Sequence, residues 1–156
     1  MHTPDISFYT YLHNADDPPQ LNIGWLDGKH PYSQGTPTDG LLDRLWIFCR
    51  ESVHVMRGCH ECELCETPSY GVRMQRDGEE LWFGSAEIRV FGPDGTTYAA
   101  PNLLFHYIVD HGYLPPAEFV AAVMHGPLPD SREYLERANA FGWGRTAARQ
   151  RRYRDS

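Results

Sequence analysis

The spacing of apolar residues predicts short strands at the start of the chain, followed by a helix. Residues 6–12 and 21–26 are rich in β-branched and aromatic side chains, and turn-forming residues follow each of these segments. From residue 38 onward the apolar positions recur at helical spacing. They are Leu41, Leu42, Leu45, Trp46, Phe48 and Cys49. We therefore expect a helix that begins with Thr38 or Asp39 as its N-cap.

A strand pattern returns in the middle of the chain. Extended segments are expected at residues 53–56, 70–74, 81–83, 86–91 and 96–99. In the fourth segment the polar residues Glu87 and Arg89 alternate with apolar ones, which predicts a strand with one face in water. Pro93, Asp94 and Gly95 form a strong turn signal before the last segment. The last two segments should therefore pair as a hairpin.

Three further helices are expected after the hairpin. They cover residues 103–111, 116–125 and 130–140. Gly112 and Gly126 are placed to stop the first two, and Asp130 or Ser131 caps the third. The pattern as a whole indicates an α+β fold with a small antiparallel sheet. We expect one domain over residues 1–144, followed by a basic tail at residues 145–156.

Composition and charge narrow the function classes. The 156 residues carry a net charge of −7, and the tail holds five arginines against one acid, so residues 1–144 carry −11. An acidic body makes a nucleic-acid partner unlikely, because phosphate binding needs clustered positive charge. There is no export signal at the start and no apolar run of the ~18 residues that a membrane helix needs. A cytoplasmic protein with reduced cysteines is therefore expected.

Three of the four cysteines lie within one segment of seven residues, Cys59-His60-Glu61-Cys62-Glu63-Leu64-Cys65. The spacing of Cys62 and Cys65, C-x2-C, lets two thiolates chelate one zinc ion from a tight turn. A third ligand comes from Cys59 or His60, which are adjacent and so seldom both reach one tetrahedral ion. We favour His60. The isolated Cys49 is expected to be a buried apolar residue of the first helix.

The fourth zinc ligand must come from another part of the chain, and His106 is the first choice. A knuckle, a hairpin and then a ligand near the start of a helix is the order of a treble-clef zinc site. His111 is the second choice, because it lies five residues further on and on another face of a regular helix. Asp110 is placed to accept the free ring N–H of His106. The predicted site is therefore His60, Cys62, Cys65 and His106.

Other metal chemistries fit the sequence less well. An iron–sulfur run C-x2-C-x2-C-x3-C fails at its fourth position, which is Ser69. Glu61 and Glu63 lie beside the ligands and could serve a small zinc hydrolase as general base. However, the deaminase, metalloprotease and serine-hydrolase signatures and the phosphate loop are absent. We therefore expect a structural zinc and lean against an enzyme.

The chain also resembles a family of small actinobacterial proteins of unknown function over residues 5–126. The resemblance is carried by Asn22-Ile23-Gly24-Trp25-Leu26-Asp27, Arg57-Gly58-x-His60-x-Cys62-x2-Cys65 and His111-Gly112-Tyr113-x-Pro115-Pro116. In that family pattern the position of His60 is fixed and that of Cys59 varies, which the resemblance adds in favour of His60. It implies a metal site but no reaction.

Two more features have a functional and a simpler interpretation. Asp27 and His30 could form an acid–base pair, but an ordinary turn after a buried tryptophan explains them better. Trp143, within Phe141-Gly142-Trp143-Gly144, could anchor a partner protein or only close the core. The function that we expect is binding to another protein, as a regulator, an adaptor or a toxin-neutralising partner.

Overall fold

The chain folds into four helices and five short strands, in a computed structural model that describes residues 2–12, 15–55, 60–66 and 71–141. In chain order they are β1 (Leu21–Asn22), α1 (Leu41–Arg50), β2 (Val72–Arg76), β3 (Glu79–Phe83), β4 (Glu87–Phe91), β5 (Thr97–Pro101), α2 (Leu104–His111), α3 (Ala117–His125) and α4 (Arg132–Ala138). The predicted α+β class is confirmed. Cys59, Ser69, Trp143 and the basic tail lie outside the described residues.

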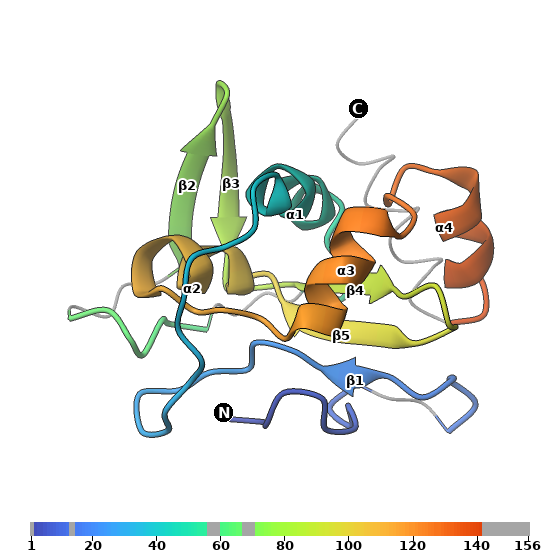
Figure 1. Cartoon of the computed structure of the whole chain (residues 1–156), viewed down its shortest axis with the longest axis horizontal. Coiled ribbons are helices and arrows are strands. Elements are labelled where there is room, and N and C mark those ends of the chain that lie inside the picture. The colour runs from blue at the N-terminus through green and yellow to red at the C-terminus, as the bar shows by residue number, and fades with distance from the viewer. Residues whose placement is uncertain (1, 13–14, 56–59, 67–70, 142–156) are drawn as a thin grey trace.

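Two small sheets organise the strands. In the first, the order is β1-β5-β4, with β5 parallel to β1 and antiparallel to β4. The second is the antiparallel hairpin β2-β3, which projects beside α1 (Figure 1). The turn at Pro93, Asp94 and Gly95 joins β4 to β5, so the predicted hairpin is confirmed.

The prediction that β4 has one face in water is wrong. All five of its residues are buried, including Glu87 and Arg89. Helices α1 and α3 lie on one side of the three-stranded sheet, and the N-terminal segment lies on the other (Figure 1). That segment brings the Tyr9 hydroxyl within 2.7 Å of the Glu87 carboxylate. The polar face of β4 is therefore covered by a segment remote in sequence, which periodicity cannot reveal.

The N-terminal segment is less regular than its composition predicts. The strand predicted at residues 6–12 is wrong, because isolated bridges replace continuous pairing in the N-terminal segment: Thr3 with Trp25 and Phe8 with Leu21. The second predicted strand is reduced to β1. Its continuation ends at Gly24, whose φ of 72° lies in the left-handed region, where a Cβ would also meet Leu104 at 2.9 Å.

The four predicted helices are present, but α1 lacks its predicted cap and α4 ends at Ala138, two residues before the predicted end. Helix α1 begins after Gly40, which takes a left-handed conformation and leaves no side-chain cap, so the expected caps at Thr38 and Asp39 are wrong. Helix α2 ends at Gly112 with φ 66°, as expected. In α4 the predicted cap at Ser131 is confirmed, because its hydroxyl accepts the Tyr134 N–H at 3.2 Å.

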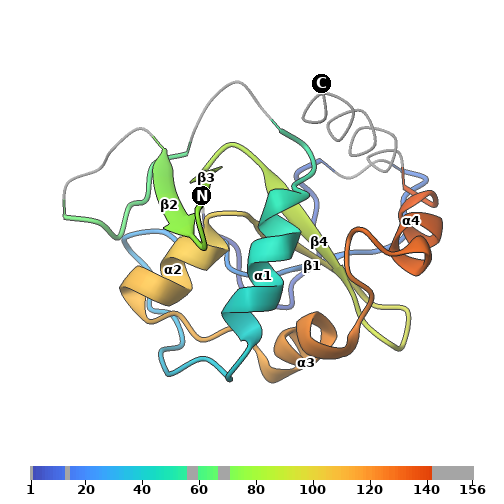
Figure 2. The same ribbon diagram turned by 90° about the horizontal axis from the view of Figure 1, so that it is seen from above.

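The main core lies between α1, α2, α3 and the three-stranded sheet. Seen from above, α1 crosses the sheet with α2 and α3 on either side of it (Figure 2). Its inward residues Leu41, Leu45 and Cys49 are buried, which confirms the expected role of Cys49. No helix in the described part of the chain is long and apolar enough to cross a bilayer. The packing of α2 in this core fixes the position of its two histidines.

Candidate metal centre

Four metal-ligating side chains from two distant segments converge at one end of the molecule. They are Cys62, Cys65, His106 and His111, and one ligand atom from each lies within 4.8 Å of all the others. The sulfur of Cys65 lies 3.3 Å from Nε2 of His106. Nε2 of His111 lies 3.4 Å from the sulfur of Cys62 and 3.4 Å from that of Cys65. This cluster could hold a metal ion.

The two cysteines are positioned by a turn that is anchored to the sheet. The backbone N–H of His60 donates to the Gly84 carbonyl at 2.7 Å, and a Cβ on Gly84 would lie 2.6 Å from the His60 oxygen. Only glycine allows this close approach, and its φ of 114° is likewise unfavourable for other residues. Within the turn, the Cys62 sulfur accepts backbone N–H groups of Leu64 and Cys65. These donors favour the thiolate that a metal needs.

The two histidines come from opposite ends of α2. His106 is the third residue of the helix and His111 is the last. The N–H groups of Gly112 and Tyr113 both donate to the Tyr107 carbonyl, which widens the last turn beyond regular α-helical geometry. The Tyr32 hydroxyl donates to the His111 carbonyl at 2.9 Å and holds this helix end. In a regular α-helix, which turns about 100° per residue, residues five apart lie on different faces. The wider last turn brings the side chains of His106 and His111 closer to one face.

A carboxylate selects the ring tautomer of His106. Nδ1 lies 2.7 Å from Oδ2 of Asp110, one turn along the helix, so the expected hydrogen bond is confirmed. With the proton on Nδ1, Nε2 presents its lone pair toward the Cys65 sulfur, on the side of the cluster. Burial lowers the pKa of His106 and outweighs the opposing effect of Asp110. The imidazole is therefore neutral at physiological pH, which is the form that binds a metal.

Burial shifts the pKa of the Cys62 thiol in the opposite direction and favours the protonated form, which does not bind a metal well. Burial raises its pKa to about 11, and the neighbouring Cys65 adds to the shift. A protonated thiol is a poor ligand, so an ion that binds here must displace its proton.

The donor set fits a tetrahedral ion better than it fits hydrogen bonds alone. Zinc–sulfur and zinc–nitrogen bonds of ordinary length place S and N ligands about 3.5 Å apart in a tetrahedron, close to the separations seen here. A ring N–H that donates a hydrogen bond points at one sulfur. Nε2 of His111, however, lies 3.4 Å from the sulfurs of both Cys62 and Cys65, as expected of ligands around a shared ion. Thiolate and imidazole donors without a carboxylate do not suit Ca²⁺ or Mg²⁺.

The structure brings together three of the four residues predicted for the site and places His60 elsewhere. His60 is exposed and lines a neighbouring cavity with Glu61 and Glu63, while His111 completes the cluster. The spacing C-x2-C followed by H-x4-H is itself a known zinc pattern and could have identified His111. A regular helix, however, would place His111 on another face than His106, and for this reason the prediction ranked His111 second.

The Asp27–His30 pair forms a local turn. Nδ1 of His30 lies 2.9 Å from Asp27 Oδ1, which also accepts the backbone N–H groups of Lys29 and His30. The His30 side chain is 53% exposed. The pair is thus satisfied within its own loop, as the simpler interpretation holds.

Comparison with known proteins connects this site to a family. A family model described as a domain of unknown function, DUF7919, matches residues 1–124, which include the whole cluster. Searches of the curated proteins and of the solved structures gave no match. Since the model spans most of the chain, the protein belongs to the DUF7919 family.

Proposed function

We propose that this is a zinc-binding protein in which one Zn²⁺, held by Cys62, Cys65, His106 and His111, is structural. The observation that carries the proposal is the convergence of four protein donors within 4.8 Å. Structural zinc sites are closed by four protein ligands, whereas catalytic sites keep one position for water. The ion would join the turn at residues 60–66 to α2, two segments that β2 to β5 separate along the chain.

The position of the acidic residues also supports a structural ion. Glu61 and Glu63 line the neighbouring cavity and are not part of the convergent cluster. None of the four donors lines that cavity. A substrate in the cavity would therefore not face the ion, and a general base there would not activate a metal-bound water.

The metal content and coordination test this proposal directly. We expect one zinc per chain and an X-ray absorption spectrum with two sulfur and two nitrogen neighbours. Zinc removal by a chelator should lower the melting temperature, since ion binding contributes to folding. A bound water in the first shell, or an unchanged melting temperature after zinc removal, would contradict a structural role.

Zinc binding should release protons. Each ligating thiol must lose its proton, and burial holds Cys62 protonated well above pH 7. About two protons should therefore leave per zinc at pH 7, and the apparent affinity should fall about tenfold per thiol for each unit that the pH is lowered. Calorimetry in buffers with different ionisation enthalpies measures the number. Release of less than one proton would mean that the thiols do not ligate.

We further propose that the protein acts by binding another protein. A broad hollow of about 570 Å³ beside β3 and the end of α1 includes Val55 and Trp82, each 50% exposed. Large exposed apolar side chains of this kind often mark interaction sites. Capture of a protein from host extract should fall strongly with Trp82→Ala and remain with Leu135→Ala, an exposed residue of α4. Equal capture by both variants would contradict this surface. The bacterial origin expected from the resemblance is likewise a prediction.

A further inference from the structure

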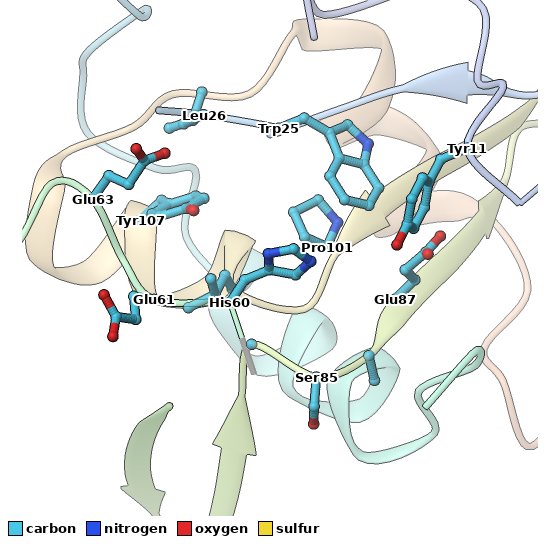
Figure 3. Close-up of a pocket in the computed structure, with 13 residues that line it drawn as sticks. Tyr11, Trp25, Leu26, His60, Glu61, Glu63, Ser85, Glu87, Pro101 and Tyr107 are labelled. Atoms are coloured by element: carbon cyan, nitrogen blue, oxygen red, sulfur yellow. The ribbon is translucent and has the colours of Figure 1, made fainter. Parts of the chain in front are cut away.

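A cavity of about 300 Å³ lies between the N-terminal segment, the turn that carries the cysteines and the start of β4. Its lining comes from segments far apart in sequence, with Trp25, Tyr107 and Pro101 around its middle and Glu87 below Tyr11 at one end (Figure 3). The volume is at the lower end of the range for small-molecule sites. The cavity has no part in the metal cluster, so its role is a separate question.

Aromatic rings form much of the cavity wall. Trp25 is fixed by a hydrogen bond from its ring nitrogen to the Ala99 carbonyl at 3.1 Å. Tyr107 projects from α2 and is buried, whereas Tyr11 is 45% exposed. Trp25 and Tyr107 thus offer buried ring surface, and Tyr11 forms the partly exposed outer wall.

A buried carboxylate lies at the end of the cavity. Oε1 of Glu87 accepts the Tyr9 hydroxyl at 2.7 Å and pairs with Arg89 at 2.9 Å. Burial raises the pKa of Tyr9, so this hydroxyl stays protonated and donates. Oε2 of Glu87 is buried without a hydrogen-bond partner, although the side chain is only 3% exposed. An unsatisfied buried carboxylate oxygen is costly, and an N–H donor entering the cavity would remove that cost.

The charge around the cavity favours a cation. None of the lining residues is a lysine or an arginine, and Glu61 and Glu63 stand with Glu87 among them. Arg89 offsets the charge of Glu87, so the two outer carboxylates leave the cavity negative. An anion would meet repulsion from these carboxylates, against which the lining offers His60 but no lysine or arginine, whereas an ammonium ion gains from the carboxylates and from the faces of Trp25 and Tyr107.

We propose that this cavity binds a small organic ammonium ion, with an N–H directed to Oε2 of Glu87 and its apolar body between the Trp25 and Tyr107 rings. The site is independent of the proposed structural zinc. The chemistry excludes phosphate and carboxylate ligands of the same size.

A series of probes matched in size tests the charge requirement. Benzylamine, benzyl alcohol and benzoate are titrated into the zinc-loaded, ¹⁵N-labelled full chain, and the Trp25 indole and Ser85 amide signals are followed. Benzylamine should shift both signals saturably. Benzyl alcohol should bind about tenfold more weakly, because it lacks the charge-assisted hydrogen bond, and benzoate should not bind. Equal affinities for the three probes, or no saturable shift with benzylamine, would overturn the proposal.

Surface variants test the site without disturbing the core. Affinity for benzylamine should fall about fivefold in the double variant Glu61→Gln, Glu63→Gln and a few-fold in Tyr11→Ala. Glu133→Gln on α4, also an exposed carboxylate, is the matched control and should bind as the native chain does. Zinc content checks that the double variant keeps the metal centre. Unchanged affinity in both test variants would overturn the assignment to this cavity.

A lysine side chain of another protein carries the same ammonium group. Nα-acetyl-lysine N-methylamide, which mimics that side chain in a peptide, distinguishes the two sources. We expect it to bind more weakly than benzylamine, because its two amide groups do not fit an aromatic-walled cavity of this size. Tighter binding of the lysine derivative would overturn the assignment to a free small molecule.

Discussion

Replacing His111 by alanine is expected to lower zinc affinity about a hundredfold or more and to reduce the melting temperature by about 6–12 °C. Loss of one of four ligands removes about 3 kcal/mol or more of the large free energy that structural zinc contributes. In a chain of this length, each kcal/mol corresponds to about 2–4 °C. Competition with a chromophoric chelator measures the affinity, and calorimetry measures the melting temperature.

His60→Ala is the matched control for this experiment. His60 lies two residues before Cys62 and would be a ligand if position in the sequence decided the site, but its side chain is exposed outside the cluster. Its replacement should leave zinc affinity unchanged and alter stability by about 0.5 kcal/mol or less. The reverse result, with zinc lost in His60→Ala and kept in His111→Ala, would show that the fourth ligand is His60.

Arg89→Ala is expected to be the most destabilising change away from the metal centre. The side chain of Arg89 is fully buried and bonds Glu87, Gln20 and the Ile88 carbonyl. Its removal leaves the Glu87 carboxylate buried without its counter-charge, which costs about 3–5 kcal/mol. The melting temperature should therefore fall by about 6–20 °C.

Two comparisons isolate the buried ion pair. Arg73→Ala removes an exposed guanidinium that lies 3.7 Å over the Trp82 ring, and should cost about 1 kcal/mol or less. The double variant Glu87→Gln, Arg89→Met removes both charges and should lose less stability than Arg89→Ala alone. If the double variant is the less stable of the two, the damage comes from lost packing and not from the uncompensated charge.

Local sequence signals predicted the elements whose cause is local. The hairpin turn at Pro93, Asp94 and Gly95 and the helix end at Gly112 appear where turn chemistry places them. Residues 6–12 have strand composition but form mainly isolated contacts. Strand pairing needs a neighbour in register over several residues, and composition carries no information about that neighbour.

The candidate site shows the same division. Cys62 and Cys65 lie within one turn, so their spacing alone predicts that both can reach one ion. Asp110 and His106 are four residues apart on one helix, and their hydrogen bond follows from helical geometry. By contrast, the choice between His60 and His111 depends on how the turn of residues 60–66 meets the last turn of α2.

The sequence by itself therefore determined the fold class and the pairing of Cys62 with Cys65, because each rests on signals between residues close together in the chain. Tertiary structure decided the fourth member of the cluster, the burial of Glu87 and Arg89, and the cavity beside them. All three depend on segments that are distant in sequence and meet only after packing. The widened end of α2 and the covering of β4 by the N-terminal segment are the physical reasons.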